Sequence, residues 1–253
     1  ELADDHSAAI ALRDECRHAK ESLVRLHEAL SGGRLHPMLV VPGGVREDTP
    51  ADWPEQLRRR AAESSGLADR LLDWISTCSV LAGIGILPRE VATSFGVSGP
   101  LARASGLALY LRFDDPYLNY AELAEAGTLV RVTRTSADAQ ARFEVLAEEL
   151  AVSLRCLEAA ANELSSAPGA EPVNVRLPRS LRVPEGSGSA WTENPTGING
   201  WFLVSRGGPM PYRLKLRTAS FANAQASSQV LAGTKLAQLP LAVMSFLIVA
   251  GDL

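Results

Sequence analysis

The sequence contains little cysteine and few aromatic residues. Its 253 residues include three cysteines, Cys16, Cys78 and Cys156, which lie far apart with no CxxC pair. An odd number at such spacing argues against a disulfide framework and a zinc ribbon, and it favours a reducing, cytosol-facing compartment. Aromatic residues make up 6% of the chain, while alanine and leucine are abundant, which favours helices over a β-sandwich.

Long apolar runs and concentrated positive charge are also missing. The longest apolar segment, 239–250, contains Pro240 and is shorter than the roughly 20 residues of a membrane-spanning helix, so we predict a buried core segment. The formal net charge is −4, and the only dense basic run, Arg58-Arg59-Arg60, is interpreted as a solvated helix face. Nucleic-acid binding is not expected, because affinity for phosphates needs a concentrated basic surface. The first residues are acidic, whereas a secretory signal is basic and then apolar, so no signal peptide is expected.

Apolar periodicity predicts a mainly α fold with a small β-hairpin element. We expect helices over residues 5–30, 51–78, 88–95, 116–126, 136–165 and 221–250. Strand-like patterns at 200–204 and 212–217, separated by a glycine-rich turn, predict the hairpin. Residues 168–195 are rich in proline, glycine and serine and predict a loop-rich connector. We treat 1–253 as a single domain that contains this connector.

Residues that carry chemistry are sparse. Three of the four histidines, His6, His18 and His27, lie on the first predicted helix with no two on one face, so a helical metal pair is excluded. His36 follows Arg34 in a loop bounded by glycine and proline, where it either is structural or orients and protonates a polar ligand. The sequence has no GxSxG elbow, no GxGxxG turn and no Walker loop, so no complete active site is expected in this chain.

Four segments, in the same order and at similar separations, carry a resemblance over nearly the whole chain. They are Gly33-Arg34-Leu35-His36 with Pro42-Gly43-Gly44-Val45, the turn 96–106, Asp115-Pro116-Tyr117-Leu118-Asn119-Tyr120, and the hairpin 200–217 with its continuation to Ala222. They are similar to the G-x-R-x-H … PGGV loop, the G-x-SG-x-x-x-R-x-SG turn, the PYDVY-like element and the hairpin of the quinone-side large subunit, or D subunit, of respiratory complex I. This family is related to the large subunit of nickel–iron hydrogenases, so the resemblance implies a hydrogenase large-subunit-like helical domain.

The resemblance implies a subunit of an NADH:quinone oxidoreductase that helps to form the quinone-reduction cavity next to an iron–sulfur subunit. Its quinone-cavity candidates in this sequence are Arg34, His36 and Leu39. Quinone is the implied substrate in this shared cavity, NADH is used elsewhere in the complex, and no metal or flavin is expected in this chain. The implied location is peripheral, on the cytoplasmic side of the cell membrane, as part of a membrane complex.

The sequence departs from the family's pattern at polar positions. The resemblance assigns contact with the quinone to a tyrosine three residues after the histidine, but Leu39 stands there and cannot donate a hydrogen bond. The family's later G-H-x-x-A-D pattern has Thr234 and Gln238 in place of the histidine and the aspartate, and Pro240 follows inside an expected helix. These losses leave open a non-catalytic structural or assembly paralogue that has lost quinone chemistry. An unrelated helical binding module is the third hypothesis.

The ends of the chain also differ from what the resemblance implies. The family's first part, with a histidine-bearing hairpin that reaches toward the quinone, is expected before Glu1, which makes this chain N-terminally truncated or shortened relative to the family. In hydrogenases the C-terminal region carries the cysteines that bind nickel. The corresponding residues here contain none, so a nickel–iron site is not expected.

Overall fold

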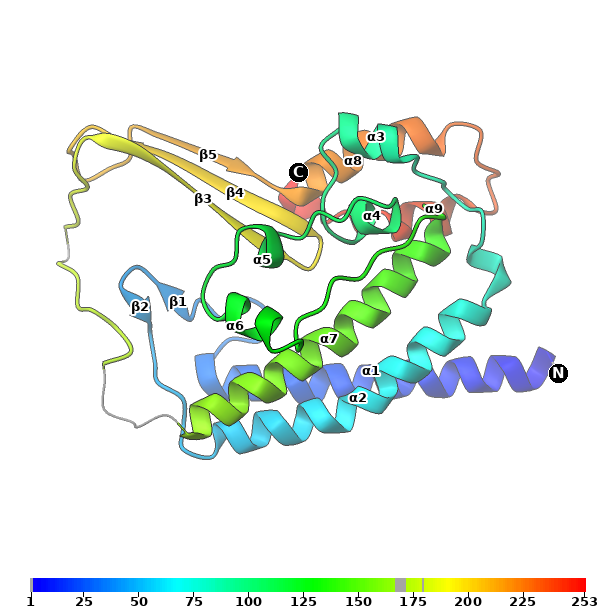
Figure 1. Cartoon of the computed structure of the whole chain (residues 1–253), viewed down its shortest axis with the longest axis horizontal. Helices are drawn as coiled ribbons and strands as arrows, with labels where there is room; N and C mark the ends of the chain where they lie inside the picture. Colours follow the sequence, from blue (N-terminus) through cyan, green and yellow to red (C-terminus); the bar gives the residue numbers. More distant parts are fainter. Residues whose placement is uncertain (1, 167–171, 179) are drawn as a thin grey trace. The chain divides into compact units, whose positions relative to one another are not determined.

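The computed structural model describes residues 2–166, 172–178 and 180–253, with side chains described from Ser7 onward. Within these ranges the chain is mainly helical and contains two small antiparallel sheets (Figure 1). The prediction of a mainly α fold with small β elements is therefore confirmed. The chain divides into two compact units. Unit 1 comprises Glu1–Leu71 and Leu150–Leu181, and unit 2 comprises Leu72–Glu149 and Arg182–Leu253.

The elements follow one another with short connections. The helices are α1 (Leu2–Ser31), α2 (Trp53–Thr77), η1 (Ser79–Leu81), α3 (Arg89–Ser94), α4 (Gly99–Ala104), α5 (Leu111–Asp114), α6 (Tyr120–Glu125), α7 (Ala139–Ser166), α8 (Ala219–Leu231), α9 (Leu239–Ser245) and η2 (Ala250–Asp252). The strands are β1 (Val40–Val41), β2 (Gly44–Val45), β3 (Gly186–Asn194), β4 (Gly197–Ser205) and β5 (Arg213–Arg217). In the described part of the chain, no helix is both long and apolar enough to cross a bilayer.

Unit 1 is held together by apolar packing between its long helices. Leu26 of α1, Leu57 of α2 and Ala161 of α7 form one buried cluster, and Trp53 packs against it. The indole Nε1 of Trp53 donates a hydrogen bond to the carbonyl oxygen of Leu26 at 3.0 Å, so the polar end of this large side chain is satisfied where it enters the core. Small residues such as Ala161, which is fully buried, let the helices approach closely.

A small sheet in unit 1 holds the loop after α1. Strands β1 and β2 pair in antiparallel fashion, and residues 173–175 continue this pairing. The amide of Val45 donates to the carbonyl oxygen of Val173 at 2.9 Å, and the amide of Val175 donates to that of Gly43 at 2.9 Å. This part of the predicted connector is therefore hydrogen bonded to the PGGV turn. Residues 168–171 and 179 of the connector lie outside the described residues, as does the side chain of His6.

The sheet of unit 2 has the order β3-β4-β5. The predicted hairpin corresponds to β4 and β5, which pair from Gly200 with Arg217 to Val204 with Arg213. The prediction of a loop at 186–194 is wrong, because these residues form β3 and pair with β4 over their whole length (Figure 1). Most side chains of β3 are small or polar and exposed. Its stability comes from the backbone ladder to β4, which local composition does not reveal.

The core of unit 2 surrounds Phe246, which is fully buried. The cluster consists of Leu87, Ala92, Val97, Leu101, Ala102, Ala226 and Phe246. The buried Arg142 of α7 lies over the Phe246 ring, with its guanidinium carbon 4.7 Å from the ring centroid, and donates to Ser245 Oγ at 2.7 Å. Burial lowers the pKa of Arg142 to about 10. This arginine therefore joins α7 to α9 through a hydroxyl and an aromatic ring.

The prediction of one helix over 221–250 is wrong. Helix α8 ends at Leu231, and α9 begins at Leu239 after a break. Pro240 lies in the first turn of α9, where a proline removes no intrahelical hydrogen bond. The proline therefore starts a helix at this point.

Candidate functional site

The loop with the three predicted quinone residues follows α1 in unit 1. The guanidinium of Arg34 donates to Glu28 Oε2 at 2.8 Å and to Glu21 Oε2 at 2.8 Å. Hydrogen bonds to Glu21 and Glu28, together with their charges, raise the pKa of Arg34. His36 is exposed and Leu39 is half-buried. Arg34 thus anchors the loop to α1, while the roles of Arg34, His36 and Leu39 toward a quinone stay predictions.

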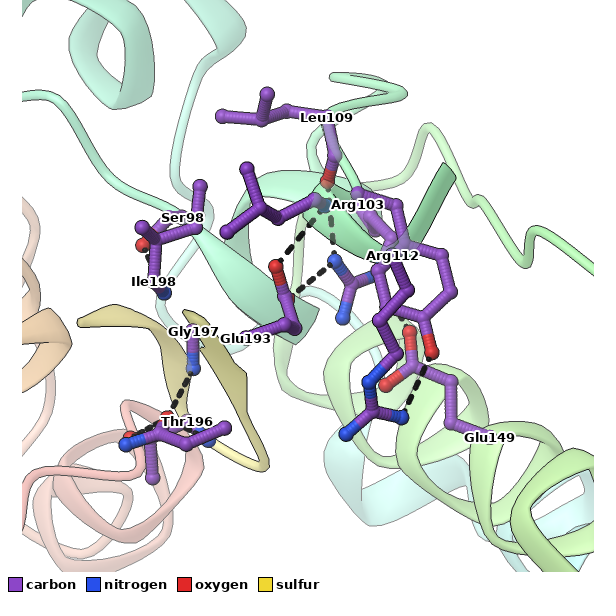
Figure 2. Close-up of polar contacts among 12 residues, drawn as sticks. Ser98, Arg103, Leu109, Arg112, Glu149, Glu193, Thr196, Gly197 and Ile198 are labelled. Carbon is purple, nitrogen blue, oxygen red and sulfur yellow. Dashed lines mark hydrogen bonds and ion pairs between the residues drawn. The ribbon is translucent and has the colours of Figure 1, made fainter. Parts of the chain in front are cut away.

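A cluster of buried charges lies in unit 2 and was not predicted from the sequence. Arg103 of α4 is 1% exposed and contacts carboxylates from two other elements (Figure 2). Its Nε donates to Glu149 Oε1 of α7 at 2.5 Å, and its Nη1 donates to Glu193 Oε1 of β3 at 3.0 Å. Nη1 also donates to the carbonyl oxygen of Leu109 at 3.0 Å. One guanidinium therefore joins α4, α7, β3 and the segment before α5.

The electrostatics of this cluster favour a charged arginine. Burial lowers the pKa of Arg103, but the charges and hydrogen bonds of Glu149 and Glu193 outweigh burial, and its pKa is raised. Removing one partner of such a buried pair costs about 3–5 kcal/mol, because the other charge stays buried and uncompensated. Glu193 also accepts a hydrogen bond from the amide of Leu111 at 3.1 Å. Its carboxylate therefore holds both the arginine and the backbone at the start of α5.

Aromatic side chains enclose the cluster. The guanidinium of Arg103 lies 4.3 Å from the centroid of the Tyr110 ring. Arg112 donates from Nη1 to the Tyr110 hydroxyl at 3.1 Å, and burial raises the pKa of Tyr110. The hydroxyl of Tyr117 accepts a hydrogen bond from the amide of Glu193 at 3.1 Å. The Asp115–Tyr120 segment is thereby tied to the end of β3.

The turn 96–106 also packs directly on the β3–β4 turn. Ser98 Oγ, which is buried, accepts a hydrogen bond from the amide of Ile198 at 3.0 Å (Figure 2). Arg217 of β5 donates from Nη1 to the carbonyl oxygen of Ile198 at 2.8 Å and from Nη2 to that of Gly96 at 2.6 Å. Three of the segments that carry the resemblance therefore meet in unit 2.

The sequence offered only a partial signal for this cluster. Arg103 stands inside the G-x-SG-x-x-x-R-x-SG turn, so the turn pointed to its importance but not to its partners. Glu149 and Glu193 lie 46 and 90 residues from Arg103, and no local periodicity connects such positions. Among the described residues, no three His, Cys, Asp or Glu side chains gather as a metal-binding group.

The fold and the buried cluster define a class of protein, namely a mainly helical scaffold in which arginine–carboxylate contacts hold glycine-rich turns against a small sheet. A family model described as the 49 Kd subunit of respiratory-chain NADH dehydrogenase matches residues 15–253, and the chain belongs to this family. The family predicted from the four segments is therefore confirmed.

Relatives and a solved structure agree with this assignment. The chain is 43% identical over 239 residues to the NADH-quinone oxidoreductase D subunit 2 of Streptomyces griseus, covering 92% of this chain and 60% of the relative. It is 44% identical to the D subunit 1 of Streptomyces coelicolor, covering 92% of this chain and 61% of the relative. The solved structure is the membrane-bound sulfane sulfur reductase, an archaeal respiratory membrane complex. One of its chains matches with a TM-score of 0.80 and 33% identity over 92% of this chain and 64% of that chain. The chain thus spans about 60% of the length of these relatives.

Proposed function

We propose that this chain is part of the D subunit of an NADH:quinone oxidoreductase-like complex and helps to form its quinone-reduction cavity next to an iron–sulfur subunit. The match of residues 15–253 to the family carries this proposal. Electrons reach the quinone from the neighbouring subunit, and NADH is oxidised elsewhere in the complex. The subunit is peripheral, on the cytoplasmic side of the membrane, and its helices follow the hydrogenase large-subunit arrangement.

In this proposal the loop after α1 supplies the surviving polar groups of the cavity wall. Reduction of a quinone adds two electrons and two protons, so its oxygens gain negative charge and need hydrogen-bond donors. The guanidinium of Arg34 is held by Glu21 and Glu28, each at 2.8 Å, and this pairing orients a cation at the start of the loop. The exposed His36 supplies an imidazole that exchanges protons near neutral pH. Leu39 supplies only an apolar contact to the ring.

The proposal predicts that Arg34→Ala or His36→Ala lowers the rate of NADH-dependent quinone reduction by the native complex. We expect a loss of about tenfold in each variant, the scale of one lost hydrogen bond to a charged group. Reduction of a water-soluble artificial acceptor by NADH measures the electron path upstream of the quinone and is expected to stay unchanged. Native gel electrophoresis checks that the complex remains assembled.

Arg25→Ala is the matched control for Arg34→Ala. Arg25 also pairs with Glu21, at 2.9 Å, but it lies within α1 and outside the loop. Its removal tests whether the loss of a contact to Glu21 is enough to lower turnover. Full quinone reduction in both Arg34→Ala and His36→Ala, with assembly intact, contradicts the proposal and identifies the chain as a non-catalytic structural paralogue.

A further inference from the structure

One face of the β3–β4–β5 sheet combines aromatic and basic side chains. Because side chains alternate between the two faces of a strand, the register assigns cross-strand neighbours to the same face. Trp191, Gly200 and Arg217 are neighbours across the three strands, and so are Ser189, Phe202 and Lys215. In the next row of this face, Arg213 pairs with Val204. The three basic residues of β5 therefore follow one another along this face, next to a tryptophan and a phenylalanine.

This face is hollowed. A cavity of about 610 Å³ is lined by Ser189, Trp191, Gly200, Trp201, Phe202, Arg213, Lys215 and Arg217. The indole of Trp191 lies across Gly200 and leaves no room for a Cβ atom there, so the glycine lets the ring lie flat on the sheet. Trp191 is nevertheless 47% exposed and Phe202 is 39% exposed. Large apolar rings with this much exposure form an open shelf beside the basic row.

The basic row is not neutralised by the described part of the chain. The lining includes three cations and no carboxylate. Arg213 and Lys215 have no ion-pair partner among the described residues, whereas the exposed Arg58 pairs with Glu55 at 2.7 Å. Arg217 donates to two backbone carbonyls. In a chain with a formal net charge of −4, this is a local concentration of positive charge that calls for a negative partner.

The spacing of the cations selects the kind of partner. Side chains at alternate positions of a strand lie about 6.6–7 Å apart, and an extended peptide presents its own alternate side chains at the same spacing. Strand β5 is at the edge of this sheet, with β4 as its only partner strand there. An edge strand can accept a further extended segment through its backbone. A flat bilayer surface fits a concave shelf with aromatic walls less well.

We propose that this hollow docks an extended acidic segment of a partner protein. Alternate carboxylates of the segment pair with Arg213 and Lys215, and an apolar side chain between them lies on Trp191 and Phe202. The inference goes beyond the proposed function, because the hollow lies within unit 2 and involves none of the quinone-cavity candidates. It assigns an assembly role to a surface whose side chains take part in no quinone chemistry.

The test places a photoreactive benzoylphenylalanine at Ser189, which lines the hollow, in the native complex. After irradiation, cross-linked peptides are identified by mass spectrometry. We expect a segment of another protein with acidic residues at alternate positions. The same group at Arg59, which is exposed on α2, is the control for nonspecific cross-linking. Cross-links only to lipid, to a second copy of this chain or to a segment without acidic residues overturn the proposal, as does the absence of any cross-link.

A charge-reversal pair then tests the ionic contacts. The double variant Arg213→Glu with Lys215→Glu is expected to lower the cross-linking yield at least tenfold, and lysines in place of the mapped carboxylates are expected to restore it. Arg58→Glu with Arg59→Glu changes the net charge by the same amount on another surface and is expected to leave the yield unchanged. Equal losses in both double variants, or no rescue, contradict the proposal. Failure of the proposed function is recognised separately, because Arg34→Ala and His36→Ala are assayed by quinone turnover.

Discussion

Arg103 and Arg58 show how differently one residue type behaves inside and outside this protein. The side chain of Arg103 is 1% exposed, while that of Arg58 is 52% exposed, and both contact glutamates. Water screens the exposed pair, so its contribution to stability is small. The buried guanidinium has lost its hydration and depends on Glu149 and Glu193 for compensation. We therefore expect the buried cluster to decide whether α4, α7 and β3 stay together.

At the residue scale, Glu193→Ala is expected to lower the free energy of unfolding by about 3–5 kcal/mol. The substitution leaves the charge of Arg103 with one carboxylate and the amide of Leu111 without its acceptor. Urea unfolding followed by circular dichroism measures the change. Glu55→Ala, which removes the partner of Arg58, is the matched control and is expected to have little effect. Similar losses in the two variants contradict the role given to burial.

At the element scale, the short helix α4 is placed by the contact of its first residue with the β3–β4 turn. Gly99 has a φ of +71°, and a Cβ atom there would lie 2.5 Å from Gly197 Cα and 2.5 Å from the carbonyl oxygen of Thr196. Backbone atoms cannot move aside as a flexible side chain does. The close approach also lets the Ser98 hydroxyl accept the Ile198 amide hydrogen at 3.0 Å. A glycine is therefore required where these two elements meet.

Gly99→Ala is expected to destabilise the protein by about 3 kcal/mol, from the sum of a left-handed backbone conformation and a steric clash. Gly127→Ala is the matched control. Gly127 has a nearly equal φ of +70°, but no atom lies within 4 Å of a Cβ placed there, so this variant loses only the conformational part. Thermal unfolding of both variants measures the difference. Equal changes in the midpoint would show that α4 does not pack tightly on the turn.

At the scale of the whole molecule, each compact unit has a core, and two helices contribute to both units. The units exchange at Leu71–Leu72 and at Glu149–Leu150, which lie inside α2 and α7. A helix is a cooperative element, since each turn depends on the hydrogen bonds of its neighbours. We therefore expect the units to unfold in one transition.

Leu154→Ala in unit 1 and Phe246→Ala in unit 2 test this expectation. Leu154 is 2% exposed and Phe246 is 0% exposed. The losses are expected to be about 2–5 and 3–5 kcal/mol, respectively, because a large buried side chain is removed and a cavity remains. Differential scanning calorimetry is expected to show a single transition that both variants move to lower temperature. Two transitions, each moved by only one variant, contradict cooperative unfolding.

Much of the fold could be predicted because its signals are local. Apolar periodicity and the glycines after the first helix predicted α1, α2 and α7, and alternation predicted β4 and β5. Strand β3 escaped prediction because its small and polar residues have no strand pattern of their own. The long C-terminal helix was predicted as one element, since small apolar residues continue through the break before Pro240. The quinone residues Arg34, His36 and Leu39 stay predictions, because the resemblance implies them and no contact among the described residues tests them.

The sequence by itself determined the helical class, the hairpin and the family, because helix periodicity, turn residues and motif order are written over short stretches of the chain. Only the tertiary structure decided what these motifs do for one another. It showed that Arg103 binds carboxylates 46 and 90 residues away and that Ser98 and Gly99 meet the β3–β4 turn. It also placed the basic residues of β5 beside Trp191 and Phe202. Burial and strand register act between distant residues, and they give these side chains their partners and their electrostatic environment.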